Sequence, residues 1–146
     1  MSGQERAKAQ REDYRYFLDI PTRWMDNDIY GHVNNVVYYS YFDTVINRFL
    51  IDEAGLDIHN GSVIGIAVES MCRFHASFAY PETIAAALRV ARIGTSSVRY
   101  ELALFPMDGI EPSAEGYFVH VFVGRHGGRP VAIPSAIRSA LERLEI

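Results

Sequence analysis

The sequence between residues 34 and 55 reads NNVVYYSYFDTVINRFLIDEAG, with no proline and no glycine before Gly55. Apolar and aromatic side chains recur at intervals of three and four residues, which predicts a helix of roughly five turns from Asn35 to about Ala54. Asn34 is suited to cap this helix, because its side-chain oxygen accepts a first-turn N–H. Polar positions are few and scattered, so we expect the helix to be mostly enclosed by the rest of the chain.

Segments rich in β-branched and aromatic residues predict strands before and after this helix. A short helix that begins with a proline is expected from Pro134 to Leu144. One long helix followed by four successive strands indicates an α+β fold, an antiparallel sheet curled around one central helix. An edge strand and part of the helix would stay uncovered, so we expect a homodimer or a dimer of dimers. The expected strands are 14–24, 63–78, 83–93, 97–105 and 114–124.

The composition excludes several classes of protein. The 146 residues fit one domain, and the net charge of −4 without a basic run argues against binding to nucleic acid. No apolar run approaches the ~18–20 residues of a membrane span. The single cysteine, Cys72, excludes a disulfide framework and a multi-cysteine metal site, and no metal or cofactor is expected. We expect residues 1–13 to be a disordered tail without a signal peptide, and residues 14–146 to be one domain of a cytoplasmic protein.

The segment that enters the long helix carries the candidate chemistry. Residues 26–35 read DNDIYGHVNN and place two carboxylates beside the unpaired amides of a helix start. A carboxylate that faces backbone donors is the minimum equipment for attack on a carbonyl. Gly31 lets the backbone turn sharply and lets a substrate approach closely. Asp26 and Asp28 have a simpler interpretation as turn or cap residues, and too few further oxygen ligands are present for a cation site.

The stretch from Arg23 to Asn35, with Tyr38 three residues further on, resembles the signature of the 4-hydroxybenzoyl-CoA thioesterase family of hotdog-fold acyl-CoA thioesterases. The resemblance implies a hotdog fold, an acyl-CoA or aroyl-CoA substrate, and hydrolysis to a free acid and CoA. It also implies a dimer with its sites at the interface and no metal or redox cofactor. Residues 74–81, 93–97 and 129–134 also resemble this family, except that 81–83 depart from its usual Gly-Asp turn.

In the family's pattern, Asp28 is the catalytic carboxylate and the backbone amide of Asn35 polarises the carbonyl. The chemistry agrees, because a thioester leaves as a thiolate whose conjugate thiol has a pKa of about 8.5. Such a leaving group hardly needs a general acid, so one carboxylate suffices as base or nucleophile. Asp26 is interpreted as structural.

Asp43 is the second candidate for the catalytic carboxylate, because some hotdog thioesterases place this group in the middle of the helix. A carboxylate in a buried helix is costly unless it is paired. The alternative is therefore a structural pairing of Asp43 with Arg48 or Arg73.

Other residues are candidates for substrate binding. His32 has no serine or cysteine beside it in a nucleophile motif, so positioning or packing is favoured over a role as general base. Asn34 and Tyr38 are expected to be a cap and a core residue, and each could also contact the substrate. The phosphates of CoA require arginines, lysines or backbone amides. The candidates near the Gly94 turn are Arg92, Thr95 and Ser96.

Two other functions are compatible with the same fold. A hotdog enoyl-CoA hydratase or dehydratase needs an acid–base pair, typically Asp with His, but Asp28 and His32 lie only four residues apart in one loop. A non-catalytic acyl-CoA binding protein is the second alternative. No DNA-binding module accompanies the domain, which argues against a regulator.

Overall fold

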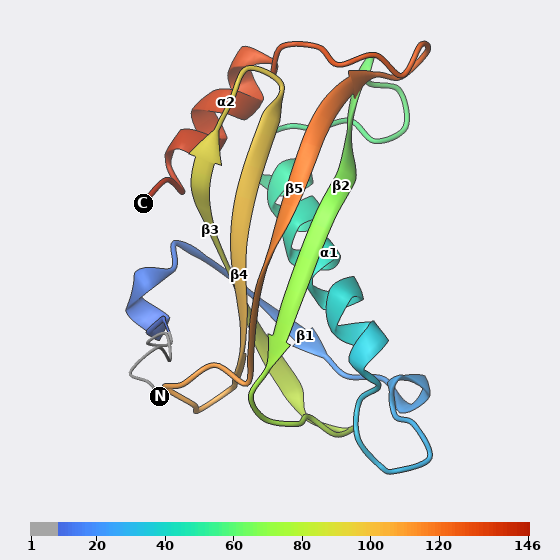
Figure 1. Ribbon diagram of the computed structural model, residues 1–146, viewed down its shortest axis with the longest axis vertical. Coiled ribbons are helices and arrows are strands. Elements are labelled where there is room, and N and C mark those ends of the chain that lie inside the picture. Colours follow the sequence, from blue (N-terminus) through green and yellow to red (C-terminus); the bar gives the residue numbers. More distant parts are fainter. Residues whose placement is uncertain (1–8) are drawn as a thin grey trace, which may run out of the picture.

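The computed structural model describes residues 9–146, and its five strands form one antiparallel sheet in the order β1-β3-β4-β5-β2. The long helix α1 lies against one face of this sheet (Figure 1). This arrangement confirms the predicted α+β hotdog fold. The elements are η1 (Arg11–Asp13), β1 (Tyr16–Pro21), η2 (Trp24–Asp26), α1 (Asn35–Asp52), β2 (Val63–Phe74), β3 (Thr83–Ile93), β4 (Ser97–Pro106), β5 (Ala114–Gly124) and α2 (Ser135–Glu142).

Helix α1 begins as predicted. The side chain of Asn34 accepts a hydrogen bond from the Val36 N–H at 3.0 Å, which confirms it as the N-cap. The helix ends at Asp52, two residues before the predicted end, and Gly55 follows with a φ of +74°. Its polar positions are mostly exposed, so the expectation of an enclosed helix is wrong for a single chain. The buried positions are Tyr38, Tyr41, Phe42, Val45, Ile46, Phe49 and Leu50.

Most predicted strand bounds are confirmed, and two strands are shorter than expected. β2 ends at Phe74 rather than at residue 78, because the next two amides both donate to the Ser113 carbonyl and leave the ladder. β1 covers only Tyr16–Pro21, and the end of the expected strand forms the 3-10 turn η2 instead. In the terminal helix, Pro134 is the N-cap residue rather than a member of the first turn.

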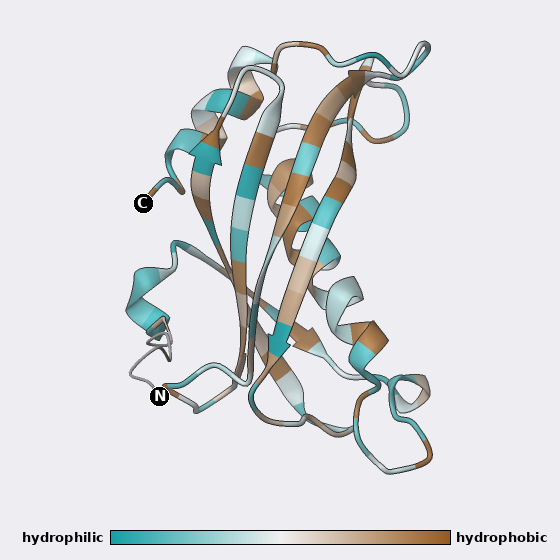
Figure 2. Ribbon diagram, viewed as in Figure 1, coloured by the Kyte–Doolittle hydropathy of each residue, from teal (hydrophilic) through white to brown (hydrophobic). Residues whose placement is uncertain are grey.

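The two faces of the sheet carry separate apolar clusters. Along β4, Val98, Tyr100 and Leu102 face α1 in the main core, because side chains two positions apart in a strand share a face. Ala103 and Phe105 belong to a smaller cluster on the outer face, together with Tyr14. Hydrophobic and hydrophilic bands alternate along β4 accordingly (Figure 2).

The N-terminal boundary of the domain differs from the prediction. Residues 1–8 of the expected tail lie outside the described residues. The following segment is ordered, because Arg11 donates hydrogen bonds to the carbonyls of Pro106 at 3.2 Å and Gly109 at 2.5 Å. The Ala9 N–H donates to the Glu115 carboxylate at 3.1 Å. The domain therefore begins before residue 14.

The two long edges of the sheet differ in how they are covered. Beyond β1, the edge of β3 is covered by the C-terminal residues: the Val90 N–H donates to the Leu144 carbonyl at 2.9 Å, and the Ile146 N–H donates to the Val90 carbonyl at 3.1 Å. β2 is the last strand on the other side, and it carries the exposed side chains of Ile66 and Val68. Within residues 9–146, no helix is long and apolar enough to cross a membrane.

Candidate active site

The loop between η2 and α1 folds back on itself as a narrow turn. The Asp28 N–H donates to the His32 carbonyl at 2.9 Å, and the Gly31 N–H donates to the Asp28 carbonyl at 3.1 Å. The Asp28 carboxylate also accepts the Tyr30 N–H at 2.9 Å, which is an Asx turn. Gly31 has a φ of +85°, so the predicted sharp turn depends on glycine here. Asp28 is thus a turn residue in this structure, and its half-buried carboxylate keeps one oxygen available.

The arms of this turn bring Asp28 back toward the helix start. Asn27 and Val33 pair as an isolated bridge, and the Asn34 N–H donates to the Asp26 carbonyl at 2.9 Å. Asp26 thus pairs with the N-cap residue Asn34, and Asp28 follows Asp26 by two positions on the same arm of the turn. The loop is also attached to the segment after β2, because the Val33 N–H donates to the Phe78 carbonyl at 2.8 Å.

Below Asp28, Asp26 is the buried anchor of the loop, with 1% of its surface exposed. Its Oδ1 accepts hydrogen bonds from the Arg23 guanidinium at 3.1 and 2.9 Å, and its Oδ2 accepts the Arg23 N–H at 2.9 Å and the Tyr41 hydroxyl at 2.7 Å. Burial acts to raise the pKa of Asp26, but these hydrogen bonds and the Arg23 charge lower it on balance. Asp26 therefore stays ionised and structural, as predicted.

Replacing Asp26 with alanine is expected to destabilise the fold by about 2–3 kcal/mol, because the buried Tyr41 hydroxyl loses its acceptor and the loop loses its anchor. Urea unfolding at pH 7 measures this difference. Asp52→Ala is the matched control, since it removes only the exposed Arg48–Asp52 pair and should cost about 0.5 kcal/mol or less. Equal losses in the two variants would contradict the anchoring role.

The start of α1 leaves one backbone donor available. The Val36 N–H is taken by the Asn34 side chain, and the Val37 N–H by the Asn34 carbonyl. Among residues 9–146, nothing accepts a hydrogen bond from the Asn35 N–H. The positive end of the helix dipole lies at the same place and favours developing negative charge. The amide that the resemblance singles out for the oxyanion is therefore the free one.

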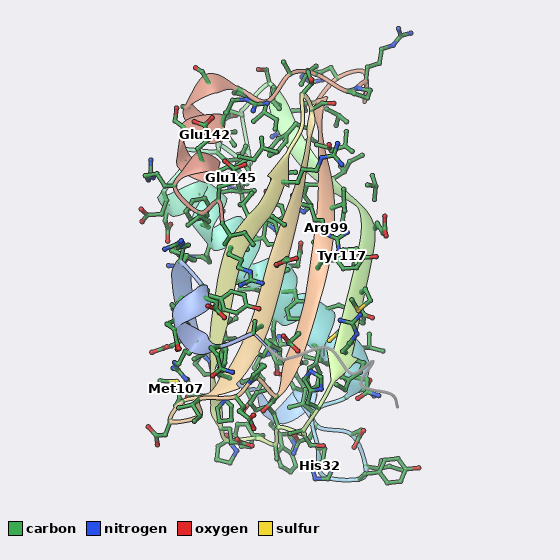
Figure 3. The ribbon with its side chains drawn as sticks, turned by 60° about the vertical axis from the view of Figure 1, so that its left-hand side comes forward. His32, Arg99, Met107, Tyr117, Glu142 and Glu145 are labelled. Carbon is green, nitrogen blue, oxygen red and sulfur yellow. The ribbon has the colours of Figure 1, made fainter. Side chains whose placement is uncertain are left out.

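His32 and Tyr38 lie in different surroundings, His32 at the surface and Tyr38 in the core. His32 is exposed at one end of the molecule (Figure 3), so it does not pack within the single chain, and its positioning or substrate-binding role stays a prediction. Tyr38 is a core residue: it is buried, its ring packs edge-on to Phe74, and its hydroxyl accepts the Phe78 N–H at 3.2 Å. Tyr38 is thus confirmed as a core residue, and its contact with a substrate stays a prediction.

The predicted partners of Asp43 are wrong. Its Oδ1 accepts a hydrogen bond from Asn47 one turn later at 3.1 Å, while Arg48 pairs with Asp52 at 2.9 Å. Asp43 lies on the exposed side of α1, so it needs no cationic partner. Burial by the surrounding protein still raises the pKa of Asp43, and the Asn47 hydrogen bond partly opposes that shift.

The candidate phosphate-binding residues lie far from Asp28 in the folded chain. Arg92, Thr95 and Ser96 belong to the β3–β4 hairpin next to α2, at the end of the sheet opposite the 26–34 loop (Figure 1). The labels of His32 and Glu142 mark these two ends in Figure 3. A single chain therefore does not bring the two parts of the predicted site together.

Large apolar side chains surround the turn and were not predicted as a group. Trp24 is 75% exposed, Ile29 94% and Tyr30 80%. The Trp24 ring also packs edge-on to the ring of Tyr80, at 5.7 Å between centroids. A cluster of this kind typically marks a binding surface. The hydrophobic positions were visible in the sequence, but their exposure was not.

The sequence model of the Thioesterase-like superfamily matches residues 22–141. The chain belongs to the thioesterase-like superfamily. This membership confirms the predicted hotdog thioesterase family and shows that the protein is a thioester hydrolase.

Three solved structures are similar to this thioesterase. PA5185 from Pseudomonas aeruginosa strain PAO1 is 55% identical, with a TM-score of 0.94 over 95% of this chain and 97% of that chain. PA2801 from Pseudomonas aeruginosa is 28% identical, with a TM-score of 0.80 over 86% and 96% of the two chains. A thioesterase superfamily protein from Jannaschia sp. CCS1 is 26% identical, with a TM-score of 0.79 over 88% and 81%.

Proposed function

We propose that this thioesterase hydrolyses acyl-CoA or aroyl-CoA thioesters, with Asp28 as the catalytic carboxylate and the Asn35 N–H as an oxyanion donor. The observation that carries the proposal is the free Asn35 N–H at the helix start, next to a turn that returns Asp28 to the same corner. This corner supplies the two groups that thioester hydrolysis needs, a carboxylate and a preorganised donor.

Two routes are open to Asp28. As a general base, it takes a proton from water while the water oxygen bonds to the carbonyl carbon, and the C–S bond then breaks to release the thiolate, which is protonated. As a nucleophile, it forms a mixed anhydride with release of the thiolate, and water then cleaves the anhydride. In both routes the carbonyl oxygen becomes an oxyanion that the Asn35 amide stabilises.

Recognition of CoA is proposed for the β3–β4 turn, through Arg92, Thr95 and Ser96. SAV2348 from Staphylococcus aureus has the same fold, with a TM-score of 0.80 and 15% identity, and its structure is a complex with CoA. The turn and the 26–34 loop lie at opposite ends of the sheet in one protomer. We therefore propose that one site combines the turn of one protomer with the loop of its partner.

We propose a homodimer that joins the β2 edges of two chains. The free edge of β2 and the exposed Ile66, Val68 and Phe74 along it provide the surface. Two antiparallel β2 edges related by a twofold axis run in opposite directions, so the β3–β4 turn of one chain lies at the same end as the 26–34 loop of the other. Sedimentation equilibrium measures the mass, and a monomer at catalytic concentrations would contradict a shared site. A further pairing into tetramers and the cytoplasmic location stay predictions.

Thiol release from a panel of saturated, aromatic and unsaturated acyl-CoAs tests the activity. We expect hydrolysis of at least one saturated or aromatic CoA thioester. Hydration of an enoyl-CoA without hydrolysis of any thioester would favour the hydratase alternative. Ligand binding, measured by calorimetry, without turnover of any substrate would favour an acyl-CoA binding protein. The same panel identifies the preferred acyl group, because the aromatic and aliphatic side chains near the 26–34 loop suit aromatic and aliphatic acyl groups equally.

A further inference from the structure

The backbone carbonyl groups of the β3–β4 turn, residues 94–96, all accept hydrogen bonds from other parts of the chain. The Gly94 carbonyl accepts a hydrogen bond from the Arg138 guanidinium, which also reaches the Thr95 carbonyl at 3.5 Å. The Thr95 carbonyl accepts the Ile133 N–H at 2.9 Å as well, and the Ser96 carbonyl accepts the Phe122 N–H at 2.8 Å. Three successive carbonyls, the groups that would repel an anion, are thus bound by neighbouring segments.

Two successive amides at the tip of the same turn are free. Neither the Thr95 N–H nor the Ser96 N–H has an acceptor in the part of the chain that the structure describes. Successive unpaired backbone N–H groups form a concave donor surface that suits a phosphate oxygen. The Thr95 side chain is exposed beside them and adds a hydroxyl donor.

Positive charge gathers around this turn although the whole chain carries −4. Arg92 and Arg99 lie directly opposite each other in the β3–β4 ladder, and like charges so placed destabilise a sheet. The Arg99 guanidinium lies 3.7 Å from the centre of the Tyr117 ring. Figure 3 shows these two side chains next to each other. Within residues 9–146, no carboxylate lies within 4.0 Å of Arg92, Arg99 or Arg138.

Arg138 is held in place from the other side of the turn. It lies on α2, which packs Ile137, Ala140 and Leu141 into the core next to β3. α2 adjoins the β3–β4 turn in Figure 1. The Arg138 guanidinium donates its hydrogen bonds to neutral carbonyls. Because no carboxylate neutralises it, its positive charge remains next to the turn.

We infer that Arg138 is a positioning residue for the CoA nucleotide: it binds the carbonyls of the β3–β4 turn, which aims the Thr95 and Ser96 amides at a phosphate group. This role rests on the proposed acyl-CoA thioesterase function. Arg138 itself does not touch the substrate. Its loss releases the Gly94 carbonyl, which lets the Gly94–Thr95 peptide rotate and turns the Thr95 amide away, and it removes one positive charge near the phosphates.

The test compares acyl-CoA with the matching acyl-pantetheine, which has the same thioester but no nucleotide phosphates. For Arg138→Met we expect KM for acyl-CoA to rise at least 10-fold, with kcat within 2-fold of the wild type. For acyl-pantetheine we expect both parameters to stay within 2-fold. Arg143→Met is the matched control, because Arg143 caps the C-terminal end of the same helix and no described residue pairs with its side chain.

Two results would overturn the role of Arg138. One is an unchanged KM for acyl-CoA in Arg138→Met, and the other is an equal loss with both substrates. Arg138→Lys keeps one charged donor and should recover part of the lost affinity, and it replaces Arg138→Met if thermal unfolding shows that variant to be misfolded. Absence of wild-type hydrolysis with both substrates would instead contradict the proposed function itself, so the two failures are distinguishable.

Discussion

Asp28→Asn is expected to lower kcat by at least 100-fold, about 2.7 kcal/mol of barrier, while leaving the fold intact. The substitution removes the charge that activates water or attacks the carbonyl. It keeps the shape, because the amide oxygen of asparagine can still accept the Tyr30 N–H in the same Asx turn. Thiol release from the best acyl-CoA of the panel measures the loss, and circular dichroism and thermal unfolding check the fold.

Asp43→Asn is the control for this experiment, since it neutralises the second candidate carboxylate on the exposed side of α1. We expect it to keep at least half of the wild-type kcat. A large loss in Asp43→Asn with normal turnover in Asp28→Asn would transfer the catalytic role to the helix. A single turnover in labelled water then separates the two routes, because only a mixed anhydride puts the label into the Asp28 carboxylate in the first cycle.

The stability of the fold is expected to fall by about 3 kcal/mol as the pH drops from about 6.5 to about 4, owing to His120. This histidine is 2% exposed in the core, its ring packs edge-on to Tyr100 at 5.1 Å, and its Nδ1 has no hydrogen-bond partner among the described residues. Burial lowers the pKa of His120 to about 4. The unfolded chain takes up a proton below about pH 6.5 while the folded chain does not, so stability is complete above that pH and declines below it.

Urea unfolding of wild type and His120→Leu between pH 7.5 and 4.5, at one protein concentration, measures this effect. The apolar variant should lose most of the pH dependence in this window, because leucine has a similar size and does not titrate. His126→Gln, in the exposed loop after β5, should keep the wild-type dependence. Parallel curves for wild type and His120→Leu would show that other groups cause the decline.

Short-range signals explain how far the sequence could predict the fold. Asn34 and Gly31 act through contacts or torsion angles within three residues, so the helix start and the turn before it were readable directly. Segments rich in β-branched and aromatic residues also placed β3 and β5 correctly. The ends of β1 and β2 were misjudged because the chain leaves the ladder to meet distant partners, such as the Ser113 carbonyl.

The candidate site divides in the same way. The sequence by itself determined the family, the Asp28 turn and the capped helix start, because these depend on residues that are neighbours along the chain. Only the tertiary structure decided that Asp26 is the buried anchor of Tyr41, that Asp43 lies on an exposed face, and that Arg138 holds the β3–β4 turn. It also placed that turn at the far end from Asp28. These features depend on which segments pack together, and pairings between residues 15 to more than 40 positions apart leave no periodic or local pattern in the sequence.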